Sequence, residues 1–400
     1  MFKNTHTMKN LLIILLFNTV NIIYSQNLNF TNLENIPSDY HSLLTTSVYN
    51  NKIIINCGQS SINPYDFLYQ YDISSEIWTT ITPNNPLVDK RYANGEVIGN
   101  NLYLFNGTSN QTLIANNLVE IVNLQTNEVN YGAENPLSRN EAGSASDGSN
   151  IYVFGGETSN DTYTNKLYSY NINSDVWTML ADMPTPQTTR GEIINDKIYV
   201  IGGYNGSVSN IIDIYNIENN EWESQFIMPD GVSANSLAVY NDLIFIVGDF
   251  IELDRINYFD TSNEVFISVD NNMIGRRHSD AEVIDNNIYL IGGNQTTNPN
   301  DGGWLNSLQK ASLNDVLSTA TINLTSEVII LPNPTTDFIK IKTISFSKYI
   351  YNIYDVTGKR VLWGENENDK YLSITNLSNG TYYFEVVFEN FSKTFKIIKE

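Results

Sequence analysis

Acidic side chains recur at one position of a long sequence repeat. Glu96, Glu192 and Glu282 each stand eleven residues before the end of a glycine-terminated apolar segment, and Arg190 and Asp280 stand thirteen before it. If the three glutamates converge, their repulsion in a poorly solvated site raises at least one pKa toward the range of proton exchange. Such a group could serve acid–base chemistry on a sugar, and a bound cation could relieve the same repulsion. A structural alternative is that each glutamate accepts backbone N–H bonds or pairs with an arginine of a neighbouring repeat.

The repeat that aligns these residues consists of apolar segments ending in Gly-Gly or a near variant. Their last positions are 58, 107, 156, 203, 249 and 293, so successive ends lie 49, 49, 47, 46 and 44 residues apart. A second motif, with two large apolar residues seven positions apart around polar turn-formers, follows each of the first five ends. Its copies are residues 71–78, 122–129, 170–177, 215–222 and 259–266. We expect each copy to be a β-hairpin, which gives four strands per period.

A four-stranded repeat of this length is the unit of a β-propeller, whose sheets stack in a ring because one sheet cannot cover both its apolar faces. The Gly-Gly ends, the Tyr-x6-Trp hairpins and a polar side chain sixteen residues before the last glycine position together resemble the Kelch repeat. Those polar side chains are Arg91, Gln187 and Arg277. The pattern departs from the family at Val122, Val129 and Asp249. The resemblance implies an all-β fold, a six-bladed Kelch β-propeller over residues 26–321.

The two ends of this region each hold part of a sheet. Residues 305–313 form one clear strand after the sixth Gly-Gly, and residues near 28–34 precede the first complete repeat. We predict that residues 28–34 form the outermost strand of the sixth sheet, which closes the ring and removes an open edge. Cys57 is the only cysteine, so closure cannot use an intrachain disulfide.

The period and the charge both change near residue 322. Residues 26–326 hold 11 basic and 35 acidic residues, whereas residues 327–400 hold nine of each. Short strands parted by Pro, Gly and Asn predict a small C-terminal β-sandwich over residues 322–400. Its motifs are Pro332-Asn333-Pro334, Tyr354-Asp355-x-x-Gly358-Lys359, Leu377-x-x-Gly380-x-Tyr382 and Lys396-x-x-Lys399. In this order they resemble the type A sorting domain of the type IX secretion system, the alternative being an accessory module of carbohydrate-binding or fibronectin type.

Residues 1–25 agree with export. Lys3 and Lys9 precede an apolar run, 11–17, that is too short to cross a bilayer at about 20 residues, which predicts a secretory signal peptide rather than a membrane anchor. The resemblance of the C-terminal region implies a Bacteroidetes-type cell, passage through the periplasm and the type IX machinery as a partner. We therefore expect a secreted or cell-surface protein without a transmembrane anchor.

Composition excludes several kinds of partner and cofactor. The net charge of -22 makes nucleic acid an unfavourable partner. A Kelch fold raises the possibility of copper chemistry, because galactose oxidase has this architecture, but three histidines and one cysteine are too few for such a site or for structural zinc. We predict no metal and no cofactor.

Aromatic residues follow the Gly-terminated strands, in the connecting loops. They are Tyr65, Tyr163, Tyr204 and Trp304. Exposed rings in such loops could stack on sugars. The first functional reading is therefore a module that binds a glycan or protein ligand at or outside the cell surface.

The second reading is an enzyme similar to the Kelch sialic-acid mutarotases. It places Arg190, Glu192, Arg277 and neighbouring carboxylates in one funnel with room for a monosaccharide. A fold alone cannot decide between the two readings, because function depends on the site. The residue types favour binding, and they do not name the ligand.

Overall fold

The computed structural model describes residues 27–39, 41–60, 67–112, 114–158, 162–298, 302–314, 328–331, 333–343, 348–367, 370–387 and 392–400. None of these segments forms a helix with the length and apolar character that a bilayer crossing needs. The chain divides into two compact units, residues 1–314 and 315–400. The predicted signal peptide and the predicted boundary between residues 321 and 322 lie outside the described residues.

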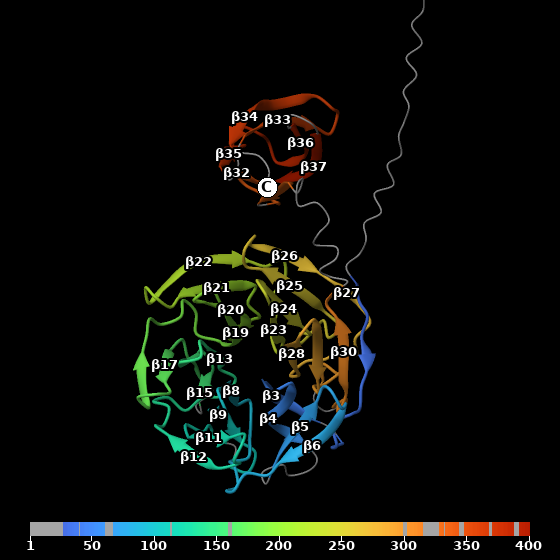
Figure 1. The fold of residues 1–400 in the computed structure, drawn as a ribbon. Helices are drawn as coiled ribbons and strands as arrows, with labels where there is room; N and C mark the ends of the chain where they lie inside the picture. Colours follow the sequence, from blue (N-terminus) through green and yellow to red (C-terminus); the bar gives the residue numbers. More distant parts are fainter. Residues whose placement is uncertain are drawn as a thin grey trace, which may run out of the picture. The chain divides into compact units, whose positions relative to one another are not determined.

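The first unit is a ring of four-stranded antiparallel sheets, six of them within the described residues (Figure 1). The first sheet contains β3 (His41–Tyr49), β4 (Lys52–Ser60), β5 (Leu68–Asp72) and β6 (Ile77–Ile81). The second contains β8 (Asn94–Ile98), β9 (Asn101–Phe105), β11 (Val119–Asn123) and β12 (Val129–Gly132). The third contains β13 (Gly143–Ser146), β14 (Asn150–Phe154), β17 (Leu167–Asn171) and β18 (Val176–Met179).

In the remaining three sheets, too, the strands are given from the innermost, at the centre of the ring, to the outermost. The fourth contains β19 (Thr188–Ile194), β20 (Lys197–Tyr204), β21 (Ile211–Asn216) and β22 (Glu221–Ile227). The fifth contains β23 (Ser236–Tyr240), β24 (Leu243–Val247), β25 (Ile256–Asp260) and β26 (Val265–Ser268). The sixth contains β28 (Asp280–Ile284), β29 (Asn287–Ile291), β30 (Leu308–Ser312) and β2 (Thr31–Asn32). Two-stranded pairs join β1 (Asn27–Leu28) to β27 (Asp270–Asn271), β7 (Lys90–Arg91) to β10 (Thr108–Ser109) and β15 (Glu157–Thr158) to β16 (Thr162–Tyr163).

The chain termini of this unit meet in the sixth sheet. Thr31 and Asn32 of β2 pair with Lys310 and Gln309 of β30, so the N-terminal segment supplies the outermost strand. The prediction of closure by residues 28–34 is confirmed. An intrachain disulfide cannot contribute, because Cys57 is the only cysteine. Strand pairing and side-chain contacts hold the two ends together.

The hairpins join neighbouring sheets through their tryptophans. In every copy the two large apolar residues pair directly across the hairpin, as with Tyr170 and Trp177. The indole N–H of Trp177 donates to the carbonyl of Ala133 in the preceding sheet at 2.8 Å, and Trp222 donates to Ala181 at 3.0 Å. The hairpins that carry Trp177 and Trp222 therefore also connect their sheets to the sheets before them.

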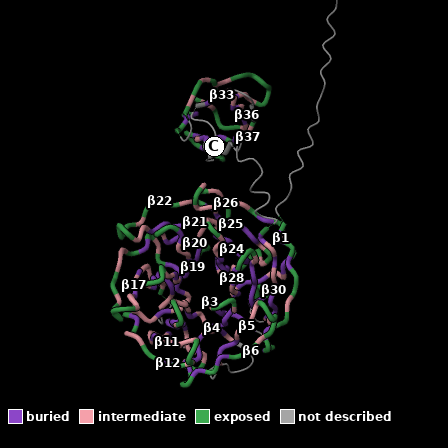
Figure 2. The backbone as a smooth tube through the Cα atoms, viewed as in Figure 1, coloured by how far each residue is buried: buried purple, intermediate pink, exposed green. Residues whose placement is uncertain are grey.

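The Gly-Gly ends are required where one sheet approaches the next. Gly202 and Gly292 have φ of 59° and 58°, and a Cβ at either would collide with the carbonyl oxygen of Val232 or His41 in the following sheet. The apolar core lies between sheets: Ile53 and Tyr71 of the first pack with Tyr289 and Ile291 of the sixth. Buried backbone accordingly follows the middle strands, and exposed backbone follows loops and outer strands (Figure 2).

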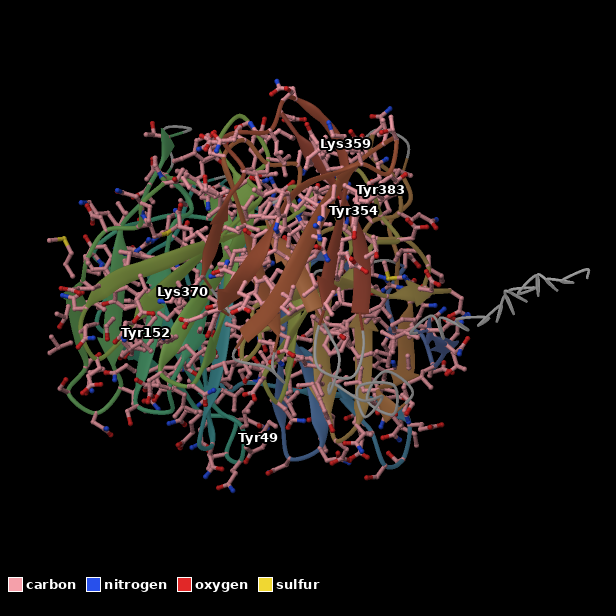
Figure 3. The ribbon with its side chains drawn as sticks, turned by 90° about the horizontal axis from the view of Figure 1, so that it is seen from above. Tyr49, Tyr152, Tyr354, Lys359, Lys370 and Tyr383 are labelled. Carbon is pink, nitrogen blue, oxygen red and sulfur yellow. The ribbon has the colours of Figure 1, made fainter. Side chains whose placement is uncertain are left out.

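The second unit is a small β-sandwich. One sheet contains β31 (Val328–Leu331), β32 (Phe338–Thr343) and β35 (Tyr371–Ser373), and the other contains β34 (Arg360–Glu367), β33 (Lys348–Asp355), β36 (Gly380–Val387) and β37 (Ser392–Lys399). The two sheets enclose a core that includes Ile339, Ile341, Ile353 and Phe384. On the outer face Tyr354 and Tyr383 are cross-strand neighbours (Figure 3).

Candidate functional site

The inner strands of all six sheets enclose a channel cavity of about 300 Å³. The predicted glutamates lie there together: Glu96 comes from β8, Glu192 from β19 and Glu282 from β28, and Asp280 and Arg190 line the same cavity. Every second side chain of a strand shares a face, so residues thirteen and eleven before the glycine position reach the channel from one side. The structure thus brings together five of the candidate residues.

Hydroxyl groups of the next sheet serve two of the glutamates. Ser144 Oγ donates to Glu96 Oε1 at 2.6 Å, and Thr46 Oγ1 donates to Glu282 Oε1 at 2.7 Å. The residue at the same register beside Glu192 is Leu237, which has no hydroxyl. Glu192 therefore lacks the partner that the other two glutamates have.

Asp280 is held differently, since the backbone N–H of Thr46 donates to its Oδ2 at 2.6 Å. A backbone N–H thus serves Asp280, which the structural alternative, stated for the glutamates, did not include.

Burial and crowding raise the pKa of each channel carboxyl. Burial is the main cause and raises the pKa of Glu96 to about 7 and that of Glu282 to about 8, with repulsion from Asp280 adding to both. The pKa of Glu192 is raised well above its usual range by burial and by repulsion from Glu96, Glu282 and Asp280, and Arg190 opposes the rise. Protons are therefore bound in this cavity near neutral pH.

A second and larger cavity, of about 450 Å³, opens at one mouth of the channel. Arg190 lines this cavity as well as the channel cavity. Arg277 lines only the mouth cavity, and Glu192 lines only the channel cavity. Arg190 therefore borders both cavities, whereas Glu192 and Arg277 each border one of them.

An open arc of main-chain hydrogen bonds lines the mouth. It runs from Ala234 through His278, Leu43, Tyr92 and Glu141 to Thr189, with each N–H donating to the carbonyl of the residue before it in this order. The first five residues share the same place in their sheets and have φ between 50° and 55°. A non-glycine residue in this left-handed region costs about 1–3 kcal/mol and is enriched at functional sites.

Three of these strained residues project titratable side chains into the mouth cavity. The Tyr92 hydroxyl interacts with the Glu141 carboxyl and lowers its pKa, and the Tyr92 ring meets the His278 ring edge-on at 5.7 Å. Burial, with repulsion from Glu157, raises the pKa of Glu141 to about 7. Burial and the charges of Arg277 and Arg190 lower the pKa of His278 to about 3, so this imidazole is neutral at physiological pH.

The guanidinium of Arg277 is fixed by its surroundings. Its Nε donates to the carbonyl of Thr296 at 2.7 Å, and its Cζ lies 4.4 Å from the centre of the Phe250 ring. Among the described residues its Nη groups make no hydrogen bond, so they remain available to the cavity. The buried Asn235 also lines the cavity, and its Nδ2 has no hydrogen-bond partner.

Other arginines ahead of the inner strands have structural contacts. Arg139 is fully buried and donates to the carbonyls of Gly155 and Lys166, and Arg276 is fully buried and donates to Gly292. They connect loops and do not reach the mouth cavity.

Of the described aromatics that were predicted, Tyr204 alone lines the mouth cavity. Tyr204 lines the cavity, is 41% exposed, and meets the Tyr163 ring edge-on at 6.1 Å. Trp304 is half-buried in the loop after β29, where its backbone forms an isolated antiparallel β-bridge with Asn294. Tyr65 lies outside the described residues.

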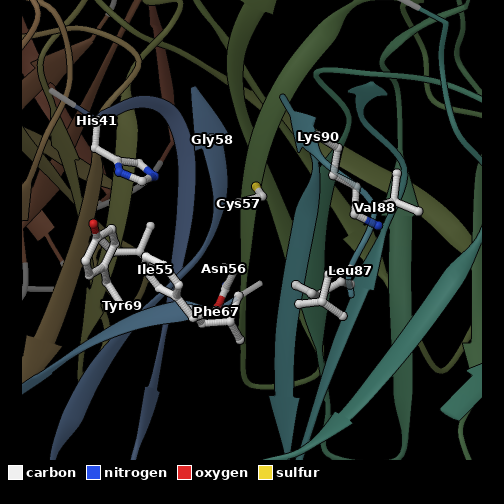
Figure 4. A pocket seen from close by; sticks show the side chains of 12 residues that line it. His41, Ile55, Asn56, Cys57, Gly58, Phe67, Tyr69, Leu87, Val88 and Lys90 are labelled. Carbon is white, nitrogen blue, oxygen red and sulfur yellow. The ribbon is translucent and has the colours of Figure 1, made fainter. Parts of the chain in front are cut away.

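Cys57 lines a separate pocket of about 30 Å³ with His41, Tyr69 and Lys90 (Figure 4). Its thiol lies 3.5 Å from Thr45 Oγ1, and burial raises its pKa. Within the described part of the chain, no group of three or more His, Cys, Asp or Glu side chains is placed to hold a metal ion.

Five residues that line the mouth cavity were not among the predicted site residues: Tyr92, Glu141, Asn235, Phe250 and His278. One signal was available: fifteen residues before the glycine position, successive repeats carry Leu43, Tyr92, Glu141, Thr188, Ala234 and His278. Packing favours similar residues at equivalent positions, so this mixture of large, acidic and imidazole side chains indicates another role.

Comparisons with known proteins agree with this architecture. A family model described as "KLHDC2/KLHL20/DRC7 Kelch-repeats domain" matches residues 93–293, half of the chain, so the chain belongs to the Kelch-repeat family. A second model, "Secretion system C-terminal sorting domain", matches residues 329–400 and implies a secreted or outer-surface protein.

Several curated relatives match part of this chain. Kelch-like protein 41b of Danio rerio is 26% identical over 234 residues, covering 56% of this chain and 38% of that protein. Kelch repeat and BTB domain-containing protein 2 of Ectromelia virus is 30% identical over 139 residues, 34% of this chain and 24% of that protein. Alpha-scruin of Limulus polyphemus is 27% identical over 175 residues, 40% and 19% respectively. The match spans less than two fifths of each relative.

Proposed function

We propose that this exported Kelch propeller is a binding protein whose mouth cavity takes a sugar-sized ligand carrying a carboxylate. One observation carries the proposal: in a chain of net charge -22, two guanidinium groups, Arg190 and Arg277, line the same cavity of about 450 Å³. Small-molecule sites in proteins typically measure about 300–1,000 Å³. Arginine suits a carboxylate because its planar fork can donate two parallel hydrogen bonds.

The other lining groups suit a polyhydroxylated ligand. Asn235 Nδ2 is a buried donor without a protein partner, and a ligand oxygen would remove the cost of leaving it unsatisfied. The Glu141 carboxyl and Tyr92 hydroxyl offer acceptors and a donor for sugar hydroxyls. Phe250 and Tyr204 offer apolar rings to the C–H face of a sugar.

Calorimetry with the full mature chain tests this proposal. We expect glucuronic acid and N-acetylneuraminic acid to bind and glucose to bind at least about tenfold more weakly, because hydrogen bonds to charged groups contribute about 1.5–3 kcal/mol. Arg190→Gln should remove the preference for the acidic sugars. Lys166→Gln is the matched control, because it also removes one positive charge but at an exposed position.

Equal binding of glucose, or unchanged binding by Arg190→Gln, would contradict the proposal. Binding of an acidic peptide without any free sugar would show that the ligand is a protein, and the glycan part would be wrong.

The mutarotase reading is a second candidate, and one observation favours it: Glu141, whose pKa burial raises to about 7, lines the cavity beside Tyr92. Mutarotation needs a base that takes the anomeric hydroxyl proton and an acid that protonates the ring oxygen as the bond between that oxygen and the anomeric carbon breaks. When the sugar ring closes on the opposite face of the open-chain carbonyl, the two proton transfers run in the reverse direction. A group with a pKa near the working pH can perform each of them.

NMR exchange rates between sugar anomers test this candidate. If it is right, the protein accelerates exchange of an acidic sugar, and Glu141→Gln loses more of this acceleration than Glu192→Gln, because Glu192 lies in the other cavity. An unchanged exchange rate in the presence of wild-type protein excludes it.

A further inference from the structure

We propose that anion binding in the mouth cavity is coupled to proton uptake by the channel carboxylates, and that Arg190 transmits the coupling. The inference rests on the proposed function, because it concerns the regulation of the same site. It starts from the position of Arg190, which lines both cavities on the inner strand β19.

Arg190 is not committed to a single carboxylate. Among the described residues it takes part in no ion pair within 4.0 Å. Its positive charge instead lowers the pKa of Glu141 in the mouth and of Glu192 and Asp280 in the channel, while it disfavours a charged His278. One cation is therefore shared by carboxylates on both sides.

The charged groups of the channel cavity come from three strands. They are Glu96 on β8, Arg190 and Glu192 on β19, and Asp280 and Glu282 on β28. The other three strands line the cavity with residues that do not titrate, such as Thr46 on β3, Ser144 on β13 and Leu237 on β23. Within the described lining, four carboxylates thus face one guanidinium.

A ligand anion at Arg190 would change this balance. Its negative charge would offset the guanidinium charge felt by the channel carboxylates and add its own repulsion. Each carboxyl then binds protons more readily. Glu192 should respond most, because Leu237 leaves it without the hydroxyl that Ser144 gives Glu96 and Thr46 gives Glu282.

The sign of the coupling follows from linkage. If the anion promotes protonation of the channel, protonation of the channel promotes binding of the anion by the same factor. The carboxylate of glucuronic acid is already ionised above about pH 5. The affinity for glucuronic acid should therefore rise as the pH falls from 8.5 to 6, because the channel carboxyls take up protons while the ligand stays ionised.

Calorimetry with glucuronic acid, in two buffers of different ionisation enthalpy, counts the protons taken up. We expect net uptake near pH 8, where Glu282 with its pKa of about 8 is partly ionised, and an affinity at pH 6 about fivefold or more above that at pH 8.5. The double variant Glu192→Gln/Glu282→Gln should lose most of the uptake and bind more tightly at pH 8.5 than wild type. The control Glu218→Gln removes a carboxylate on an exposed outer hairpin and should change neither. Binding without proton uptake, or uptake that persists unchanged in the double variant, overturns the coupling while leaving the proposed function intact.

A second measurement decides the case in which no acidic sugar binds and the proposed function fails. Carbon-13 NMR of glutamate-labelled full-length protein, compared with Arg190→Gln, reports the carboxyl titrations without ligand. A Glu192 titration midpoint that is higher in Arg190→Gln than in wild type supports the electrostatic link through Arg190. Midpoints that do not move overturn it.

Discussion

At the channel mouth, Tyr92, Glu141 and His278 owe their positions to left-handed backbone that links neighbouring sheets. This conformation is uncommon for such residues, so residue type alone gave no reason to expect it. The sequence did place the channel glutamates, because strand alternation and the repeat fix which side chains face inward. The difference between the two groups is therefore local: regular strands are predictable from pattern, and strained turns are not.

The channel carboxyls predict how stability depends on pH. Glu282 has an ordinary pKa of 4.5, and burial and Asp280 raise it to about 8 in the folded protein. The folded chain thus binds more protons than the unfolded chain between these values, and stability present below pH 4.5 is lost as the pH rises through 8. We expect the urea midpoint to fall between pH 5 and pH 8.5.

Glu282→Gln should reduce this fall, and the exposed Glu218→Gln should not. A wild-type midpoint that rises over the same interval would show that the channel carboxyls are not the controlling groups.

Strand elements also carry buried charge away from the channel. Lys90 Nζ of β7 lies 2.8 Å from Glu120 Oε2 of β11, with side-chain exposures of 1% and 0%. Glu120 Oε1 accepts the backbone N–H of Val88 at 2.8 Å, so one carboxylate ties a loop and a cation to the second sheet. The alternating pattern of β11 could not predict this, because Glu120 faces inward beside apolar Val119 and Val122.

Glu120→Gln should lower the free energy of unfolding by about 3–5 kcal/mol, because it leaves the Lys90 charge buried without a partner. Replacing both residues, as in Lys90→Met/Glu120→Gln, should cost less than the single change. Urea unfolding of the full chain measures both, and a loss below about 1 kcal/mol for Glu120→Gln would mean that the site is open to solvent.

At the scale of the molecule, ring closure depends on a short N-terminal segment. Leu28 and Phe30 are buried, the N–H of Phe30 donates to Asn272 Oδ1 at 2.6 Å, and Gln309 Nε2 donates to Asn32 Oδ1 at 2.9 Å. The repeat count and the incomplete sixth sheet were enough to predict this pairing. The cavity at the channel mouth was not predicted, because residues of the irregular segments ahead of the inner strands, such as Tyr92 and Asn235, line it.

Phe30→Ala should lower the free energy of unfolding by about 3–5 kcal/mol, as expected for a buried aromatic side chain, and should expose the edge of β30. The exposed Phe338→Ala in the sandwich is a matched control with little expected effect. Equal stability of the Phe30 variant and wild type would contradict closure by this strand.

The most direct test of the proposed ligand site is arginine side-chain NMR. The chain has seven arginines, so Nε–H signals of nitrogen-15-labelled full-length protein can be assigned by single Arg→Lys changes. On titration with glucuronic acid, the signals of Arg190 and Arg277 should shift along one binding curve, while those of the buried Arg139 and Arg276 stay in place. Shifts confined to other arginines, or no shift at saturating sugar, would contradict the assignment of the mouth cavity as the binding site.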